Sequence, residues 1–264
     1  MNTFWVQVDI SHEGVAKRFF MNDCGGRDQV VAAINQGGWR NYEAPMPEVI
    51  AKLCRGLKPI FIDVGANTGY YSMLSIASGA SKVFAFEPVP SIHGIFKNNI
   101  KESDMMHQIE LFEVGVGEAN GSFTLYLPEA GHGLIETSAS LNKDFRSSHS
   151  DEYTVKVITL DTFGEDHVCE LVGRQVLMKI DVETFEPQVI LGGLNFIRTH
   201  RPVIAIEILP GTDIKFFENF CAEQNYEHIW LRPDEPIELS HGPIEASLMH
   251  RDHLLVPAEK MGSL

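Results

Sequence analysis

The chain has 264 residues, of which 44% are hydrophobic and 22% charged, and a formal net charge of −15. This composition is typical of a globular protein with a substantial core. The acidic surplus argues against nucleic-acid and anionic-membrane partners, because both bind clustered Lys and Arg.

Three absences indicate the setting of the protein. The four cysteines (Cys24, Cys54, Cys169 and Cys221) are scattered and show no metal-site or disulfide spacing. The N-terminus lacks the pattern of a signal peptide, and no apolar run approaches the ~18 residues of a membrane span. We therefore expect a cytoplasmic protein that does not associate with membranes.

The first 44 residues have the weakest pattern. Alternation over 4–10 indicates a strand with one buried face, and 30–34 has the pattern of a helical turn. Apolar residues between Val49 and Leu57 then predict one face of a helix. We expect residues 1–44 to form a cap or lid ahead of a main domain at 45–264.

From Ile60 onward, short apolar runs alternate with helical patterns. The expected strands cover 60–64, 82–87, 109–116, 122–127, 153–159, 176–181, 203–208, 226–231 and 253–256. The expected helices lie near 69–78, 90–102, 185–198 and 212–224. This alternation predicts an α/β fold with a mostly parallel sheet covered by helices on both faces, whose ligand site lies where the strands end.

The middle of the chain is predicted less regularly. Asn120-Gly121 predicts a hairpin between the strands at 109–116 and 122–127, and Asp161 is expected to cap a short helix. Residues 128–150 read as a long loop, a type of segment that is often functional. His132 and His149 lie in it and have side chains suited to proton transfer, although a loop histidine is more often simply solvated.

A glycine loop follows the strand at 60–64. Asp63 ends the strand, and Gly65, Asn67 and Gly69 follow at alternate positions. Glycines allow close backbone approach to a ligand, although a tight turn alone also explains them. The spacing fits neither the dinucleotide fingerprint nor the P-loop. An acid at this place suits an ammonium group, and the loop resembles motif I of methyltransferases that use S-adenosylmethionine (SAM).

The next two strands add candidates for nucleoside binding. Glu87 ends the second strand, where a carboxylate can accept hydrogen bonds from both ribose hydroxyls, and Pro88 fixes the turn that follows. Gly115, at the third strand's end, would lie beside the adenine, or else marks a turn or bulge. Without the dinucleotide fingerprint, SAM is favoured over NAD.

The strand at 176–181 ends in three carboxylates: Asp181, Glu183 and Glu186. One of them could bind the SAM ammonium, serve as general base for a hydroxyl, or pair with a neighbour around a divalent metal, and the spacing leaves these roles open. Glu186 also suits the first turn of a helix. Glu207, which closes the strand at 203–208, adds a fourth carboxylate to the same edge or is solvated there.

With these motifs in place, the chain resembles the FkbM family of SAM-dependent methyltransferases over residues 40–257. Four blocks carry the resemblance, at 61–69, 85–88, 159–161 and 179–186, followed by Arg201-Pro202 and Glu207. It implies a Rossmann-like class I methyltransferase fold with a seven-stranded sheet whose last strand is antiparallel. It also implies methyl transfer from SAM to a hydroxyl of a sugar, a polyketide or a similar small metabolite.

Carried over residue by residue, the resemblance assigns Glu87 to the ribose. The family's SAM loop falls on Asp63, Gly65, Asn67 and Gly69, and its acids near the transferred methyl fall on Asp181, Glu183 and Glu186. There is one departure, since Thr184 stands where the family usually has Gly. A β-branched residue disfavours positive φ, so we expect a different local backbone or pocket there. Ser138 to Leu141 loosely matches a variable element of the family and receives no role.

The prediction is therefore a SAM-dependent O-methyltransferase with a small hydroxyl-bearing acceptor and no assigned metal. Its predicted catalytic residues are Asp181, Glu183 and Glu186, and its predicted cofactor-binding residues are Asp63, Gly65, Asn67, Gly69, Glu87, Pro88, Gly115 and Asp181. Two alternatives are a non-catalytic SAM-binding partner of a biosynthetic enzyme and, less favoured, an NAD-dependent oxidoreductase.

Overall fold

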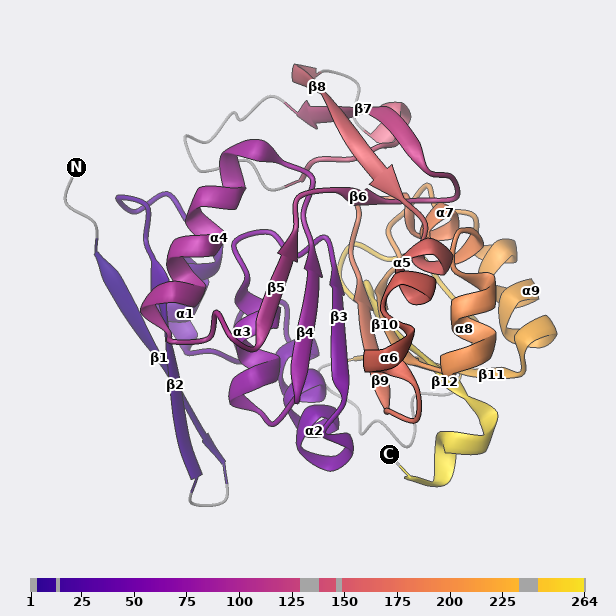
Figure 1. The fold of residues 1–264 in the computed structure, drawn as a ribbon, viewed down its shortest axis with the longest axis horizontal. Coiled ribbons are helices and arrows are strands. Elements are labelled where there is room, and N and C mark those ends of the chain that lie inside the picture. The colour runs from indigo at the N-terminus through magenta and orange to yellow at the C-terminus, as the bar shows by residue number, and fades with distance from the viewer. Residues whose placement is uncertain (1–3, 13–14, 129–137, 146–148, 233–241, 264) are drawn as a thin grey trace.

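The computed structural model describes residues 4–12, 15–128, 138–145, 149–232 and 242–263. Within them the central sheet has the strand order β11-β12-β10-β9-β3-β4-β5 (Figure 1). Its strands are β3 (Ile60–Val64), β4 (Lys82–Phe86), β5 (Ile109–Phe112), β9 (Val176–Ile180), β10 (Val203–Glu207), β11 (Tyr226–Trp230) and β12 (Asp252–Pro257). The five strands from β10 to β5 pair in parallel, and β12 runs antiparallel to both its neighbours. The predicted seven-stranded, mostly parallel sheet with an antiparallel last strand is confirmed.

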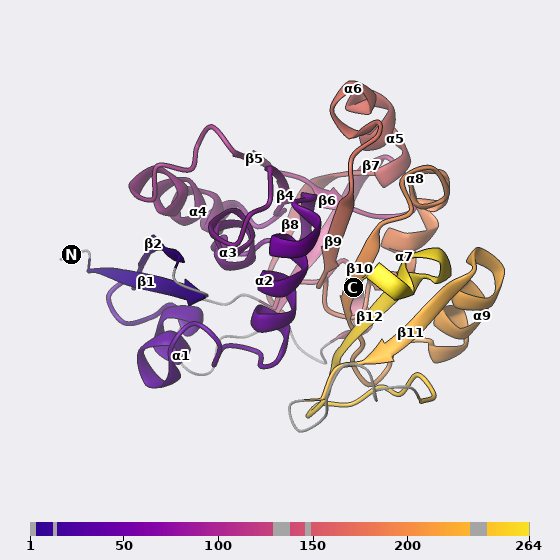
Figure 2. The ribbon, with the colours of Figure 1, turned by 90° about the horizontal axis from the view of Figure 1, so that it is seen from below.

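Helices cover both faces of this sheet (Figure 2). One face packs against α2 (Met46–Leu57), α3 (Tyr70–Ala77) and α4 (Pro90–Glu102). The other face packs against α5 (Leu160–Asp166), α6 (Val168–Leu171), α7 (Glu186–Leu191), α8 (Leu194–His200) and α9 (Ile214–Gln224). With both faces covered, β3, β9 and β10 are buried along their whole length, which explains why they appear in the sequence as continuous apolar runs.

A second, three-stranded sheet lies across the carboxyl-terminal edge of the central strands (Figure 1). It contains β6 (Gly115–Val116), β7 (Gly121–Pro128) and β8 (His149–Ile158), in the order β6-β8-β7. The predicted hairpin at Asn120-Gly121 is therefore wrong, because β6 and β7 each pair with β8 and not with each other. The Asn120 side chain instead accepts a hydrogen bond from the Thr159 amide (2.9 Å) and donates one to the Thr162 hydroxyl (2.8 Å).

The N-terminal segment forms a hairpin and a helix: β1 (Trp5–His12), β2 (Val15–Asn22) and α1 (Gln29–Gly37). Sequence reasoning missed β2. The hairpin packs on α4, where the Phe20 amide donates to Ser103 Oγ and the Asn22 amide to Asn99 Oδ1, both at 2.9 Å. Val8 is buried in the same core as α2 and α3. The domain boundary between residues 44 and 45 stays a prediction.

Two predicted helical features differ in detail. The single helix expected at 185–198 is two helices, separated at Gly192-Gly193. A Cβ at Gly192 would lie 2.0 Å from the Gly117 carbonyl oxygen, so the two chain segments meet there. Thr159, not Asp161, caps α5, by accepting a hydrogen bond from the Thr162 amide. Two short 3-10 helices also lie in the described part of the chain, at Lys143–Phe145 and Ala258–Ser263.

No helix in the described part of the chain is both long and apolar enough to cross a membrane.

Candidate active site

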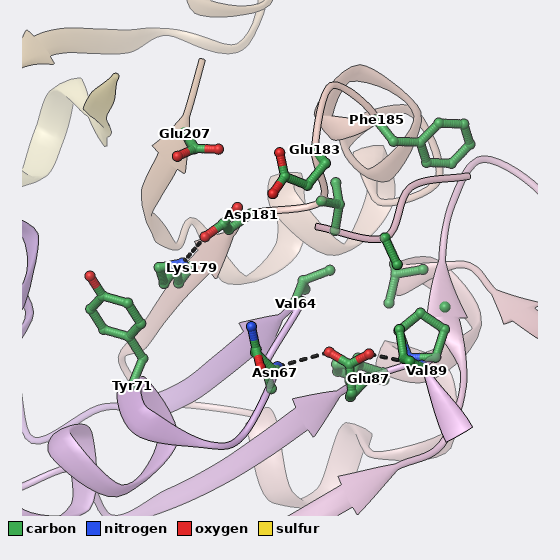
Figure 3. Close-up of a pocket in the computed structure, with 18 of the residues that line it drawn as sticks. Val64, Asn67, Tyr71, Glu87, Val89, Lys179, Asp181, Glu183, Phe185 and Glu207 are labelled. Carbon is green, nitrogen blue, oxygen red and sulfur yellow. Dashed lines mark hydrogen bonds and ion pairs between the residues drawn. The ribbon is translucent and has the colours of Figure 1, made fainter. Parts of the chain in front are cut away.

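A cavity of about 920 Å³, counted with its open mouth, lies at the carboxyl ends of the central strands. We call one side the Glu87 end, lined by Asn67, Glu87, Pro88 and Gly115, and the other the Asp181 end, lined by Glu43, Asp181, Glu183, Glu207 and Arg251. Figure 3 shows side chains of both ends facing a common space.

The glycine loop is tightly packed beside this cavity. Gly65 has φ +82°, and a Cβ on it would lie 1.9 Å from the Asp181 carbonyl oxygen. The amides of Gly65 and Ala66 both donate to the Phe86 carbonyl at 3.0 Å. Gly69, at φ +92°, leaves no room for a side chain against the Phe96 ring. These glycines are therefore required by close approach and by left-handed backbone.

Glu87 is 4% exposed, and its carboxylate is held by main-chain groups. Oε2 accepts a hydrogen bond from the Asn67 amide and Oε1 one from the Val89 amide, both at 2.8 Å (Figure 3). Burial raises the pKa of Glu87 to about 7, although the two amides oppose this shift. The carboxylate is thus fixed in direction and retains lone pairs for a ligand.

Three predicted site residues lie outside the lining of the cavity: Asp63, Gly69 and Glu186. Asp63 is 1% exposed, and its Oδ2 accepts a hydrogen bond from the Ser72 hydroxyl at 2.6 Å. Its Oδ1 has no hydrogen-bond partner among the described residues. Burial raises the pKa of Asp63 to about 6, against the lowering effect of Lys179. Asp63 therefore links the end of β3 to the first turn of α3.

The Asp181 end also contains Lys179, the first residue of the block at 179–186, to which the sequence analysis gave no role. Lys179 Nζ lies 2.6 Å from Asp181 Oδ2 and 4.4 Å from the centre of the Tyr71 ring. Burial alone would lower the pKa of Lys179, but the charges of Asp181, Glu43 and Asp63 raise it overall. In turn, burial tends to raise the pKa of Asp181, and Lys179 outweighs it and lowers that pKa. Asp181 is therefore held ionised.

Glu43 and Arg251, from opposite ends of the chain, complete the Asp181 end. Arg251 Nε lies 2.8 Å from Glu207 Oε1, and its Nη2 lies 3.2 Å from Glu43 Oε1. The Tyr71 hydroxyl donates to Glu43 Oε2 at 3.0 Å. Neither Glu43 nor Arg251 was predicted, because neither stands in a motif. Only the fold brings them together.

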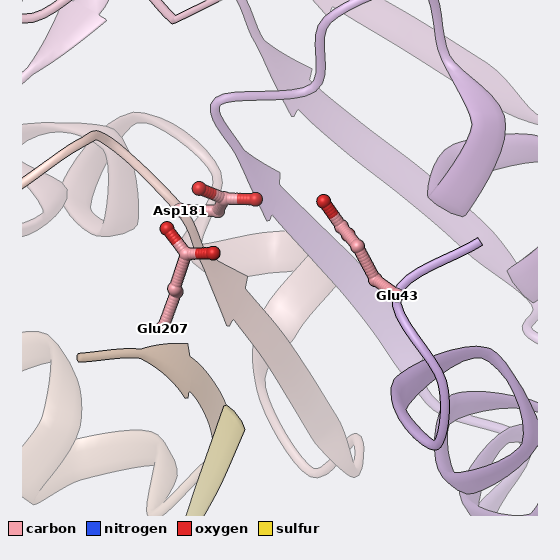
Figure 4. Close-up of side chains that lie close together, drawn as sticks. All are labelled: Glu43, Asp181 and Glu207. Carbon is pink, nitrogen blue, oxygen red and sulfur yellow. The ribbon is translucent and has the colours of Figure 1, made fainter. Parts of the chain in front are cut away.

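Carboxylate oxygens of Glu43, Asp181 and Glu207 lie within 4.8 Å of one another (Figure 4). Carboxylates this close are able to ligate a divalent ion. Here each already has a cationic partner, Arg251 or Lys179. Burial and the charge of Asp181 raise the pKa of Glu207 far above its ordinary value. Two cations thus compensate the three carboxylates, and we assign no metal to the group.

The segment after Asp181 leaves the extended conformation. Glu183 has φ +56° and Thr184 φ +71°, so the Glu183 carboxylate stands on a turn and not on an extended strand. Glu186 is completely buried, and its Oε1 accepts hydrogen bonds from the amides of Val182 (3.1 Å) and Thr184 (3.2 Å). Burial raises the pKa of Glu186 to about 8. Glu186 therefore organises the turn from within.

Thr184 keeps positive φ despite its β-branched side chain. A β-branched residue thus occupies left-handed backbone here, and a backbone or pocket that differs from the family's stays a prediction. The histidines considered for proton transfer are not placed, since His132 and the side chain of His149 lie outside the described residues.

Comparisons with known proteins agree with this architecture. The family model "Methyltransferase FkbM domain" matches residues 63–228. A comparison with curated proteins finds no match.

Several solved structures are similar to this chain at low sequence identity. A methyltransferase FkbM from Methylobacillus flagellatus is 15% identical, with a TM-score of 0.49 over 75% of this chain and 43% of its own. This chain thus spans less than half of that protein. An O-methyltransferase from Bacillus cereus in complex with SAH is 11% identical, with a TM-score of 0.47 over 85% of this chain and 86% of its own.

A precorrin-6y C5,15-methyltransferase from Geobacter metallireducens is 11% identical, with a TM-score of 0.41 over 80% of this chain and 85% of its own.

The family model extends from the acid before the glycine loop to the closing hairpin of the sheet, well over half of the chain. The chain belongs to the FkbM family of SAM-dependent methyltransferases.

Proposed function

We propose that this protein transfers a methyl group from SAM to a hydroxyl of a small metabolite such as a sugar or a polyketide. The observation that supports it most is that Glu87 and Asp181 line one cavity from opposite ends. The formal charge of −15 disfavours a nucleic acid or an anionic membrane as the acceptor.

The Glu87 end fits the nucleoside part of SAM. Glu87 would accept hydrogen bonds from the ribose hydroxyls, since each of its oxygens accepts only one amide hydrogen bond. Pro88, Val89 and Leu141 give this end an apolar lining suited to adenine. Gly65, where a Cβ would collide with the chain, keeps the loop close enough to serve as the floor of the site. When bound, SAM supplies an electrophilic methyl group.

The Asp181 end would hold the acceptor hydroxyl. A general base works best with a pKa near the working pH, and Lys179 makes Asp181 a weak base by keeping it ionised. We therefore assign Asp181 to orient the hydroxyl and the methionine ammonium, and Glu183 to receive the hydroxyl proton. Glu186 acts through the turn that carries Glu183. Positioning of the reacting groups would supply most of the catalysis.

Calorimetric binding of SAM and S-adenosylhomocysteine (SAH) tests the cofactor site. We expect micromolar binding by wild type and a loss of ~10-fold or more in Glu87→Gln. The NH₂ group of the new glutamine would face the main-chain amide of Asn67 or Val89, which is also a donor, and the side chain would have one acceptor fewer for the ribose. Glu113→Gln is the matched control, since Glu113 is an exposed acid after β5 that pairs with Lys97.

Transfer of a labelled methyl group from SAM to a panel of hydroxylated sugars and polyketides tests the reaction. Glu183→Gln should bind SAH within ~2-fold of wild type and lose turnover. Absence of SAM and SAH binding by wild type would refute the proposal. Binding without turnover on any acceptor would instead favour the non-catalytic SAM-binding partner.

A further inference from the structure

Residues 138–142 form a short bridge between the small sheet and the Asp181 end. Ser140 is 1% exposed and pairs with Tyr126 of β7 through two main-chain hydrogen bonds of 2.9 and 3.1 Å. Ala139 and Leu141 pack on the core formed by Val89, Ile92 and the small sheet. The segment is thus anchored on rigid structure, and Ala139 and Leu141 also line the cavity.

The turn that the bridge reaches has an unfavourable backbone. Glu183 and Thr184 are consecutive residues with positive φ, a conformation that is unfavourable for a residue other than glycine and least favourable for a β-branched one. The turn nevertheless carries Val182, Glu183 and Phe185 along the cavity wall. Contacts from outside the turn are needed to hold it in this conformation.

Two side chains of the bridge make those contacts. Ser140 Oγ donates to the Glu183 carbonyl at 2.7 Å, and Asn142 Nδ2 donates to Thr184 Oγ1 at 2.8 Å. The Asn142 amide group is itself oriented, because its Oδ1 accepts from the Asp144 amide at 3.0 Å. With Glu186 bonded to the same turn from within, both residues with positive φ are held from two sides.

We propose that Ser140 and Asn142 are positioning residues that keep the Glu183–Thr184 turn in its left-handed conformation, with the hydroxyl of Thr184 as the point of attachment. The hydrogen bond from Asn142 offsets the cost of placing threonine at φ +71°. The small sheet thereby sets the cavity wall formed by Val182, Glu183 and Phe185. This inference rests on the proposed function only where SAH binding is the measurement.

The test compares variants at Thr184 and Asn142. Thr184→Val keeps the β-branch and removes the hydroxyl, Thr184→Ser keeps the hydroxyl, and Thr184→Gly removes both the attachment and the strain. We expect Asn142→Ala and Thr184→Val each to weaken SAH binding ~5-fold, the effect of one lost hydrogen bond. Thr184→Ser should stay within ~2-fold of wild type. Adding Asn142→Ala to Thr184→Gly should change SAH affinity less than ~2-fold, because glycine has no hydroxyl for Asn142 to bond.

Hydrogen exchange at the Val182 amide gives a second readout that needs no ligand. Exchange should be ~5-fold faster in Asn142→Ala and Thr184→Val than in wild type, and insensitive to Asn142→Ala when residue 184 is glycine. Melting temperatures of all variants report on folding. The proposal is overturned if Asn142→Ala has the same effect in both backgrounds, or if neither readout responds to it. Failure of wild type to bind SAH would remove the proposed function and leave the exchange result to decide this inference.

Discussion

The two ends of the cavity hold their carboxylates in different ways. At the Glu87 end, one carboxylate is fixed by two main-chain amides, that of Val89 in the turn after β4 and that of Asn67 in the glycine loop. At the Asp181 end, Lys179 and Arg251 hold three carboxylates through side-chain ion pairs. One of these pairs, Arg251 with Glu43, joins residues 208 positions apart.

This difference shows what each end depends on. A main-chain site is set by a local loop conformation, so its weak point is any residue that alters the loop. A buried ion-pair network depends on every member, because removal of one partner leaves an uncompensated charge. The Glu87 end should therefore be most sensitive to backbone changes, and the Asp181 end to changes of charge.

Gly65→Ala should have the largest effect and should destroy the Glu87 end. The added Cβ would lie 1.9 Å from the Asp181 carbonyl oxygen, at a φ of +82°. We expect the free energy of unfolding to fall by about 3–5 kcal/mol and SAH binding to be lost, as measured by denaturant titration and calorimetry. Gly94→Ala is the control, since Gly94 in α4 has nothing within 4 Å of its would-be Cβ. It should stabilise by about 0.5–1 kcal/mol. Equal tolerance of both changes would contradict the close-packed loop.

Arg251→Met should have the next largest effect, confined to the Asp181 end. Glu43 and Glu207 would face each other without their shared guanidinium, and partial exposure of Arg251 moderates the cost to about 2 kcal/mol of unfolding free energy. SAH affinity should change less than ~2-fold. Arg40→Met, which breaks the exposed 3.7 Å pair with Glu48, should cost less than about 1 kcal/mol. A tenfold loss of SAH affinity in Arg251→Met would place Arg251 at the cofactor instead.

The predictable parts of the fold are those that depend on local pattern. β3 and β10 appear as short apolar runs because helices bury both their faces. The helix α4 begins with Pro90 and ends at Glu102, where the sequence predicted it, because proline suits the first turn. Glu87 was found because its strand-end position is itself a local signal.

The remaining features depend on pairing that no local pattern encodes. Asn120-Gly121 has the composition of a hairpin turn, yet β8 pairs with the strands on both its sides. Glu43 and Arg251 belong to segments outside the matched family region at 63–228. The conformation of Thr184 was not predicted because the hydrogen bond that supports it comes from Asn142, in a different segment.

Glu186→Gln should have the smallest effect on the free energy of unfolding at pH 5, and its main consequence is a change in pH dependence. Burial raises the pKa of Glu186 from 4.5 to about 8, so between these values the folded protein keeps a proton that the unfolded chain has lost. The free energy of unfolding contributed by Glu186 therefore falls as pH rises through this window.

Glutamine at position 186 keeps an oxygen for the Val182 and Thr184 amides without the charge. Denaturant titrations at pH 5 to 8 should show a shallower decline in Glu186→Gln, by up to about 1.4 kcal/mol for each pH unit. Glu113→Gln should leave the slope of unfolding free energy against pH unchanged. Lys97 lowers the pKa of the exposed Glu113 carboxyl, so this group is ionised in both the folded and the unfolded protein between pH 5 and 8. A parallel decline in Glu186→Gln and wild type would mean that this carboxyl is ionised throughout, and that the turn bearing Glu183 tolerates a buried charge.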